Sequence, residues 1–183
     1  DGLGSTPLGD VMAATPTGDV TEVPFKPRLT DTGEKHPVTQ GLKGASKTDP
    51  QWGRWFRLIT SRTEHGNAVL AGADEKPLVV LDRVGQGRVA QLLSDHLWVW
   101  NRGIDGGGPQ PELVRRVAHW LMKEPDLEEE ALRATSTGGR IEVTRRTLAA
   151  TFPKVKMTGP GAPAPGQPGS GGTERMLELK QIA

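Results

Sequence analysis

Asp95 and His96 carry the clearest candidate chemistry in the chain, since they are adjacent and follow the apolar run at 88–93. A histidine can take up or release a proton near neutral pH, and a neighbouring carboxylate can orient its ring. Binding crevices of α/β sheets open where buried strands end, so the pair is a candidate site with His96 as base or ligand contact. The alternative is that Asp95 caps the following turn while His96 packs against a tryptophan.

Two tryptophans and an arginine follow this pair. Trp98, Trp100 and Arg102 are candidates for a stacking platform that binds a ligand. In an extended segment, alternation places Trp98 and Trp100 on the same side. The alternative is that both tryptophans cover an edge of the sheet or contact another part of the parent protein.

The sequence excludes several kinds of chemistry. No cysteine occurs, which excludes disulfides, thiolate-bound metals and a cysteine nucleophile within this chain. No metal site is predicted, because His36 and His65 lie in expected loops without carboxylates at ligand spacing. No cofactor is predicted either, because Gly85-Gln86-Gly87 lacks the spacing of a phosphate-binding loop and is typical of a hairpin turn.

Charge and hydropathy restrict the partners. The 23 basic and 22 acidic residues leave a formal net charge of +1, which gives no reason to expect nucleic acid or an anionic membrane surface. No apolar run approaches the roughly 20 residues that span a bilayer, so direct membrane insertion by this chain is not expected. We therefore expect a soluble fragment whose partner is another protein or the remainder of its own parent chain.

Hydrophobic periodicity predicts the elements that must position these residues. The strongest signals are a hairpin, with strands at 78–82 and 88–93, and a helix at 111–125 between two prolines. The nearly continuous apolar runs of the hairpin indicate a sheet buried on both faces. Weaker patterns predict short helices at 7–14 and 127–134 and extended segments at 20–29, 55–61, 66–71, 140–148, 155–158 and 176–180.

The character of the sequence changes after the 111–125 helix. We therefore predict two domains, an α/β domain at 1–125 and a small β-rich segment at 126–183. Residues 159–172 (GPGAPAPGQPGSGG) are mostly glycine and proline and predict a loop inside the second.

Two blocks also resemble a known family. The blocks GQGRVAQLLSDHLWVW and HWLMKEPDLEEEAL are similar to the glutamine amidotransferase-like domain of large bacterial membrane-anchored proteins. STPLGDVMAATPTGDV and KHPVTQGL resemble loops of the same family, so the resemblance covers roughly residues 5–135. It implies an α/β, flavodoxin-like sheet of the class I amidotransferase kind, present here in part and followed by the β-rich segment.

The resemblance also carries expectations about activity and location. The family's earlier strands, and the elbow of its cysteine nucleophile, would precede residue 1. Active enzymes have a His-x-Glu pattern where this chain has Asp95-His96, which makes glutaminase chemistry doubtful. The parent protein is expected to be anchored in the bacterial inner membrane, on a side that the sequence does not fix.

Three functions remain open at this point. The first is a non-catalytic structural or interaction domain that resembles amidotransferases in fold only. The second is a hydrolase or amidase half-site completed by upstream residues, and the third is a small-molecule or glycan sensor that uses Asp95, His96 and the tryptophans. Missing strands would expose an apolar sheet edge, so self-association is also predicted.

Overall fold

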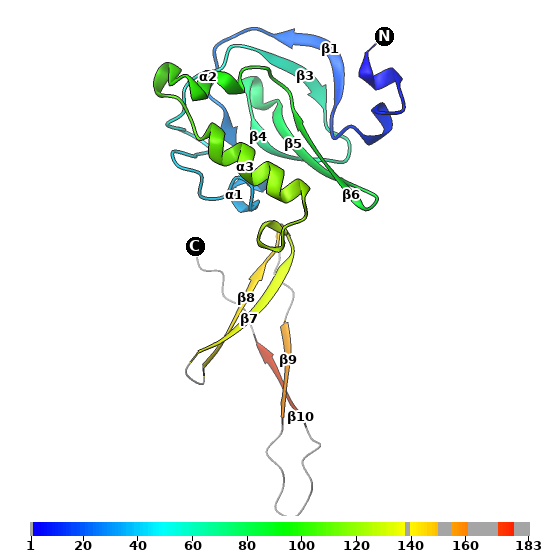
Figure 1. The fold of residues 1–183 in the computed structure, drawn as a ribbon, viewed down its shortest axis with the longest axis vertical. Helices are drawn as coiled ribbons and strands as arrows, with labels where there is room; N and C mark the ends of the chain where they lie inside the picture. The colour runs from blue at the N-terminus through cyan, green and yellow to red at the C-terminus, as the bar shows by residue number, and fades with distance from the viewer. Residues whose placement is uncertain (1, 138–139, 150–154, 161–171, 178–183) are drawn as a thin grey trace, which may run out of the picture. The chain divides into compact units, whose positions relative to one another are not determined.

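The computed structural model describes residues 2–137, 140–149, 155–160 and 172–177 (Figure 1). Two compact units are present, residues 1–148 and residues 149–183. The predicted domain boundary after residue 125 rests on sequence character and stays a prediction.

A four-stranded antiparallel sheet forms the centre of the first unit, in the order β2-β4-β5-β6. Its strands are β2 (Arg28–Leu29), β4 (Asn67–Ala71), β5 (Pro77–Val84) and β6 (Gly87–Leu92). A two-residue turn joins β5 to β6, and Gly85 supplies the positive φ of 56° that this turn needs. The predicted hairpin is confirmed.

A second antiparallel ribbon pairs β1 (Thr15–Thr21) with β3 (Leu58–Arg62). Ile59 in β3 donates its N–H to the carbonyl of Leu93, just beyond β6, at 2.8 Å. The ribbon is thereby attached to the end of the central sheet that leads into the candidate site.

The predicted flavodoxin-like α/β fold is wrong. Every strand pair in the described residues is antiparallel, whereas a flavodoxin-like sheet is built from parallel strands. That fold was expected from the resemblance over residues 5–135, and the Leu78–Leu81 run did not argue against it, because a run buried on both faces is also typical of a parallel strand. The Gly85-Gln86 turn shows that β5 and β6 cannot be parallel, because a connection between parallel neighbouring strands needs about a dozen residues or more.

Two helices lie side by side over the central sheet, α1 (Asp31–Lys35) and α3 (Gln110–Leu121). Thr30 caps α1 by accepting the N–H of Gly33 at 2.9 Å. Arg116 of α3 donates to the carbonyl of Gln40, just after α1, at 2.6 Å. The predicted 111–125 helix is confirmed but ends earlier.

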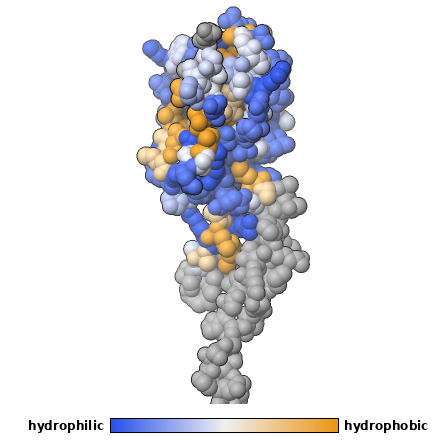
Figure 2. Space-filling view, turned by 90° about the vertical axis from the view of Figure 1, so that its right-hand side faces the viewer, coloured by the Kyte–Doolittle hydropathy of each residue, from blue (hydrophilic) through white to orange (hydrophobic). Residues whose placement is uncertain are grey.

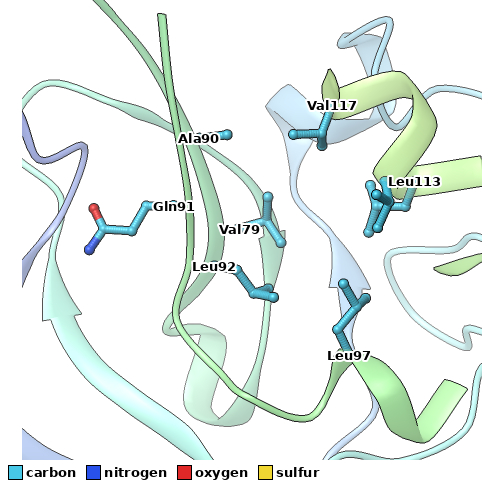
Figure 3. A pocket seen from close by; sticks show the side chains of 8 residues that line it. Val79, Ala90, Gln91, Leu92, Leu97, Leu113 and Val117 are labelled. Atoms are coloured by element: carbon cyan, nitrogen blue, oxygen red, sulfur yellow. The ribbon is translucent and has the colours of Figure 1, made fainter. Parts of the chain in front are cut away.

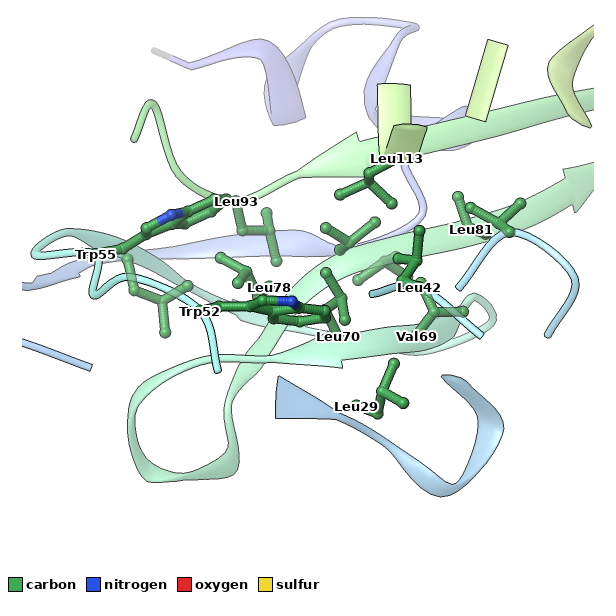
Figure 4. Close-up of a cluster of buried hydrophobic side chains, with 14 of the residues drawn as sticks. Leu29, Leu42, Trp52, Trp55, Val69, Leu70, Leu78, Leu81, Leu93 and Leu113 are labelled. Carbon is green, nitrogen blue, oxygen red and sulfur yellow. The ribbon is translucent and has the colours of Figure 1, made fainter. Parts of the chain in front are cut away.

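The hydrophobic core lies between the strands and these helices (Figure 4). Three tryptophans form one of its ends: the ring of Trp100 lies 5.0 Å from that of Trp52 and 4.8 Å from that of Trp55. The ten core residues labelled in the figure are Leu29, Leu42, Trp52, Trp55, Val69, Leu70, Leu78, Leu81, Leu93 and Leu113.

Segments with weaker patterns depart from the prediction. The segment at 127–134 is not helical: it belongs to the hairpin of β7 (Ala131–Thr137) and β8 (Arg140–Arg146). Tertiary contacts of its glutamates, described below, override its helix propensity. The helix predicted at 7–14 is also wrong, since only 3-10 turns form there. The 3-10 turns of the first unit are Leu3–Ser5, Gly9–Val11, Ala73–Glu75, Ile104–Gly106 and Pro125–Leu127.

In the second unit, β9 (Val155–Pro160) pairs antiparallel with β10 (Gly172–Leu177). The expected strand at 155–158 is thus present. Residues 176 and 177 of the one expected at 176–180 belong to β10, and its other residues lie outside the described part of the chain. Most of the predicted loop at 159–172 lies outside the described residues.

Candidate functional site

The candidate site lies where β6 leads into the short helix α2 (Leu97–Asn101). Ser94 fixes this junction, because its hydroxyl donates to the carbonyl of Arg57 at 2.6 Å and accepts the N–H of His96 at 3.1 Å. The His96 backbone is therefore held against the segment that leads into β3.

The ring of His96 is hydrogen-bonded at Nδ1 and faces a carboxylate at Nε2. Its Nδ1 accepts the backbone N–H of Phe56 at 3.1 Å, and its Nε2 lies 3.7 Å from Oδ1 of Asp95. An atom that accepts an N–H cannot carry a proton itself, so the neutral ring has its proton on Nε2. This is the reverse of the Ser-His-Asp arrangement, in which Nδ1–H faces the carboxylate and Nε2 receives the proton.

Asp95 is a surface residue with a basic neighbour. Its side chain is 63% exposed, and its Oδ2 lies 3.3 Å from Nη1 of Arg57. Arg57 also lies 3.9 Å from Glu22 through its Nε. Asp95 therefore does not cap the α2 turn through its side chain, but forms an exposed pair with Arg57.

Three aromatic side chains form a surface around this histidine, which we call the aromatic surface: Phe56, His96 and Trp98. The His96 ring centroid lies 6.2 Å from that of Phe56 and 6.4 Å from that of Trp98, both edge to face. Phe56 is 38% exposed and Trp98 is 54% exposed. Large aromatic side chains open to solvent are typical of recognition surfaces.

The structure separates the other two predicted platform residues. Trp100 is 3% exposed and donates its indole N–H to the carbonyl of Gly53 at 2.9 Å, so it belongs to the core. The extended segment that would put Trp98 and Trp100 on one side is wrong, because α2 is helical and residues two apart point in opposing directions. Arg102 follows Trp98 by one helical turn and is exposed.

A second polar cluster lies at the base of the β7–β8 hairpin, and its members His36, Trp120 and Glu129 are buried. Oε1 of Glu129 accepts the indole N–H of Trp120 at 2.8 Å and lies 3.3 Å from Nε2 of His36. Nδ1 of His36 accepts the N–H of Val38, so Nε2 carries the proton and donates to Glu129. Arg83 pairs with the other carboxylate oxygen.

These donors determine the charge of Glu129. Burial alone would raise the pKa of this carboxyl, but hydrogen bonds from His36, Arg83 and Trp120 outweigh burial and hold its pKa well below the usual range. Glu128 pairs with Arg83 and Arg88, which lower its pKa against the same opposing effect of burial. The cluster therefore holds ionised carboxylates in place, as an anchor for the hairpin.

No sequence pattern predicts this cluster. His36 was a candidate for metal binding only, and it is 93 positions away from Glu129, so no local pattern links the two residues. Within the described residues, no group of three or more histidine and carboxylate side chains is placed to hold a metal ion. In that same part of the chain, every helix is too short or too polar to cross a membrane.

Comparison with protein-family models, with curated proteins and with solved structures finds no match for this chain. The assignment of a function therefore rests on the geometry of the site.

Proposed function

We propose that this chain is a non-catalytic interaction domain that contacts its partner through the aromatic surface. One observation carries the proposal: His96 is held by the Phe56 amide and faces Asp95, while Trp98 beside it stays exposed. A rigid aromatic side chain open to solvent buries a large area on binding and loses little conformational entropy.

The geometry of the nearest hydroxyl argues against the hydrolase alternative. The Ser94 hydroxyl gives its proton to the Arg57 carbonyl, and it meets His96 at the backbone N–H rather than at the ring. A nucleophilic serine needs a histidine nitrogen with a free lone pair within hydrogen-bond reach. The Nδ1 lone pair is already used by Phe56.

A glycan or small-molecule ligand is the second candidate. Asp95 and Arg57, both largely exposed, supply a carboxylate and a guanidinium beside the aromatic surface. An aromatic side chain packs against the apolar face of a sugar ring, and charged side chains beside it form hydrogen bonds with the sugar hydroxyls.

The resemblance over residues 5–135 supports one further part of the proposal, that the chain is one domain of a bacterial membrane-anchored protein.

A displayed random-peptide library selected on the full chain tests the interaction domain. We expect peptides that bind the wild type and lose about tenfold or more in affinity on the Trp98→Ala variant, since an exposed aromatic anchor carries a large share of binding energy. Leu8→Ala is the matched control, because Leu8 is equally exposed at 57% and lies outside the aromatic surface.

Soluble oligosaccharides titrated into the same protein, with tryptophan fluorescence as the signal, test the second candidate. A Trp98-dependent response to oligosaccharides, without peptide enrichment, would favour glycan recognition over a protein partner. Hydrolysis of glutamine or of p-nitrophenyl acetate that disappears in His96→Ala would contradict the non-catalytic assignment.

A further inference from the structure

The strand β6 has a free edge. In the β5–β6 pair, Val84 lies opposite Gly87 next to a two-residue turn, and these two residues form a hydrogen-bonded pair. Every second residue of β6 counted from Gly87 therefore bonds to β5. Leu93 keeps this alternation, since its N–H donates to Leu78 at 2.9 Å. The N–H and C=O groups of Arg88, Ala90 and Leu92 therefore point away from β5, and no described residue accepts a hydrogen bond from these three amides.

This edge lacks the usual protection against pairing. Natural edge strands are shielded by proline or by charged side chains that repel an incoming strand. β6 contains no proline, and its single charged residue is Arg88. The Arg88 side chain is 3% exposed because it turns inward to Glu128 and donates to the carbonyl of Trp120 at 2.5 Å.

An apolar groove runs beside the free edge, between β6 and α3 (Figure 3). Its volume is about 130 Å³, enough for an aliphatic side chain. Gln91 offers it no polar group, because its side chain points away and bonds the N–H and C=O of Ala14, each at 2.9 Å. The side chains of the groove are those of Val79, Ala90, Leu92, Leu97, Leu113, Val114 and Val117.

Exposed apolar side chains continue from the groove over the same elements. Leu92 is 37% exposed, while Val114 and Leu121, two turns apart on one side of α3, are 43% and 39% exposed. Figure 2 shows hydrophobic side chains gathered among hydrophilic ones on one face of the first unit. A strand added at β6 would cover them.

We infer that β6 pairs antiparallel with β6 of a second copy of this chain, so that two central sheets join into one. A twofold axis at Ala90 sets Ala90 opposite Ala90 and Arg88 opposite Leu92, and all outward N–H and C=O groups of the strand are then in register. No like charges meet at this pairing, and a net charge of +1 gives little repulsion between copies. Leu92 of each copy then covers apolar side chains of the other.

Sedimentation velocity of the full chain over a range of concentrations tests the pairing. We expect the mass to rise from 19.6 kDa towards twice that value. Leu92→Lys and Val114→Lys should each raise the dissociation constant about tenfold or more, since each would bury an unpaired charge. Val23→Lys is the matched control, because Val23 is 47% exposed and lies outside the groove.

Amide hydrogen exchange separates edge pairing from any other dimer. The amides of Arg88, Ala90 and Leu92 should exchange fast at low concentration and become protected as the dimer forms. A monomer at every concentration, a dimer that Leu92→Lys leaves intact, or a dimer without this protection would each overturn the inference. Trp98→Ala should not change the mass, so this test is independent of the proposed function.

Discussion

Glu129 shows how single residues hold the first unit together. It is 7% exposed, yet it keeps its charge because Arg83, His36 and Trp120 all donate to it. A buried carboxylate with these partners lowers the stability of the folded protein little while all of them remain. Removal of one partner lowers the stability strongly, because a charge is then left buried without compensation. The residues that supply them lie on β5, on α3 and just after α1, so this one side chain ties the base of the β7–β8 hairpin to three parts of the fold.

Replacing Glu129 by glutamine should lower the free energy of unfolding by about 2–4 kcal/mol. The amide oxygen still accepts from Trp120 and His36, but Arg83 loses one of its two charged partners and keeps only Glu128. Urea unfolding at neutral pH measures the effect. Glu64→Gln, in an exposed turn, should change it by less than about 0.5 kcal/mol.

The same carboxyl should make the protein sensitive to acid. Its pKa in the folded state lies well below the ordinary value of 4.5, so its contribution is complete above about pH 4.5 and is lost as the pH falls towards the folded-state pKa. The free energy of unfolding of the wild type should therefore decrease below that pH. The free energy of unfolding of the Glu129→Gln variant should decrease less steeply over the same range. Equal slopes in the two proteins would show that Glu129 is not the sensitive group.

Trp98 should be the accessible tryptophan of the five. The other four are between 0% and 3% exposed, whereas Trp98 is 54% exposed. Acrylamide should therefore quench a distinct fraction of the fluorescence in the wild type, and Trp98→Phe should remove that fraction. Because the side chain is exposed, Trp98→Phe should alter the free energy of unfolding by no more than about 0.5 kcal/mol.

At this scale the sequence places part of the aromatic surface. His96 and Trp98 are two positions apart, and their ring centroids lie 6.4 Å apart in the structure, while a binding role for either residue stays a prediction. Phe56, 40 positions from His96, was missed, since its bond to the ring depends on how the segment before β3 packs against the end of β6.

At the scale of elements, α1 and β4 are packed closely enough to require glycine at one position. A methyl group on Gly33 would overlap the carbonyl of Val69 in β4. The backbone of this helix therefore lies directly against the strand, which also lets the Thr30 hydroxyl donate to Ala68 at 2.6 Å.

Gly33→Ala should destabilise the protein by about 2 kcal/mol or more, because the helix must move away from β4 to admit the methyl group. Gly2→Ala is the control, since a methyl group there meets no atom within 4 Å. Thermal unfolding of the two variants measures the difference. Equal melting temperatures would contradict the close approach of α1 and β4.

The elements with strong local signals were predicted correctly, and those shaped by distant contacts were not. The β5–β6 hairpin and α3 have turn or proline signals and clear apolar periodicity. The segment at 127–134 has good helix formers, but Glu128 and Glu129 bond to Arg83 and Arg88, which come from the preceding hairpin. No local rule contains that information.

At the scale of the whole molecule, the first unit is an antiparallel α+β structure with its helices on a sheet of four strands. The same apolar runs suit a parallel sheet with helices on both faces, so periodicity alone could not separate the two. The direction of pairing also changes the site. In an antiparallel sheet the carboxyl ends of neighbouring strands lie at opposite ends of the sheet, so they cannot form one shared binding crevice. The aromatic surface is instead built from three places: Phe56 in the segment before β3, His96 after the end of β6, and Trp98 in α2.

The central claim is that His96 is part of a binding surface and not a free base. Long-range proton–nitrogen NMR of the full chain at about pH 8, where histidine is ordinarily neutral, measures this directly. We predict that the proton of the His96 ring lies on Nε2 and that Nδ1 is unprotonated and accepts the Phe56 amide. A ring with its proton on Nδ1 and a free lone pair on Nε2 is the arrangement of a catalytic base, and would contradict the account.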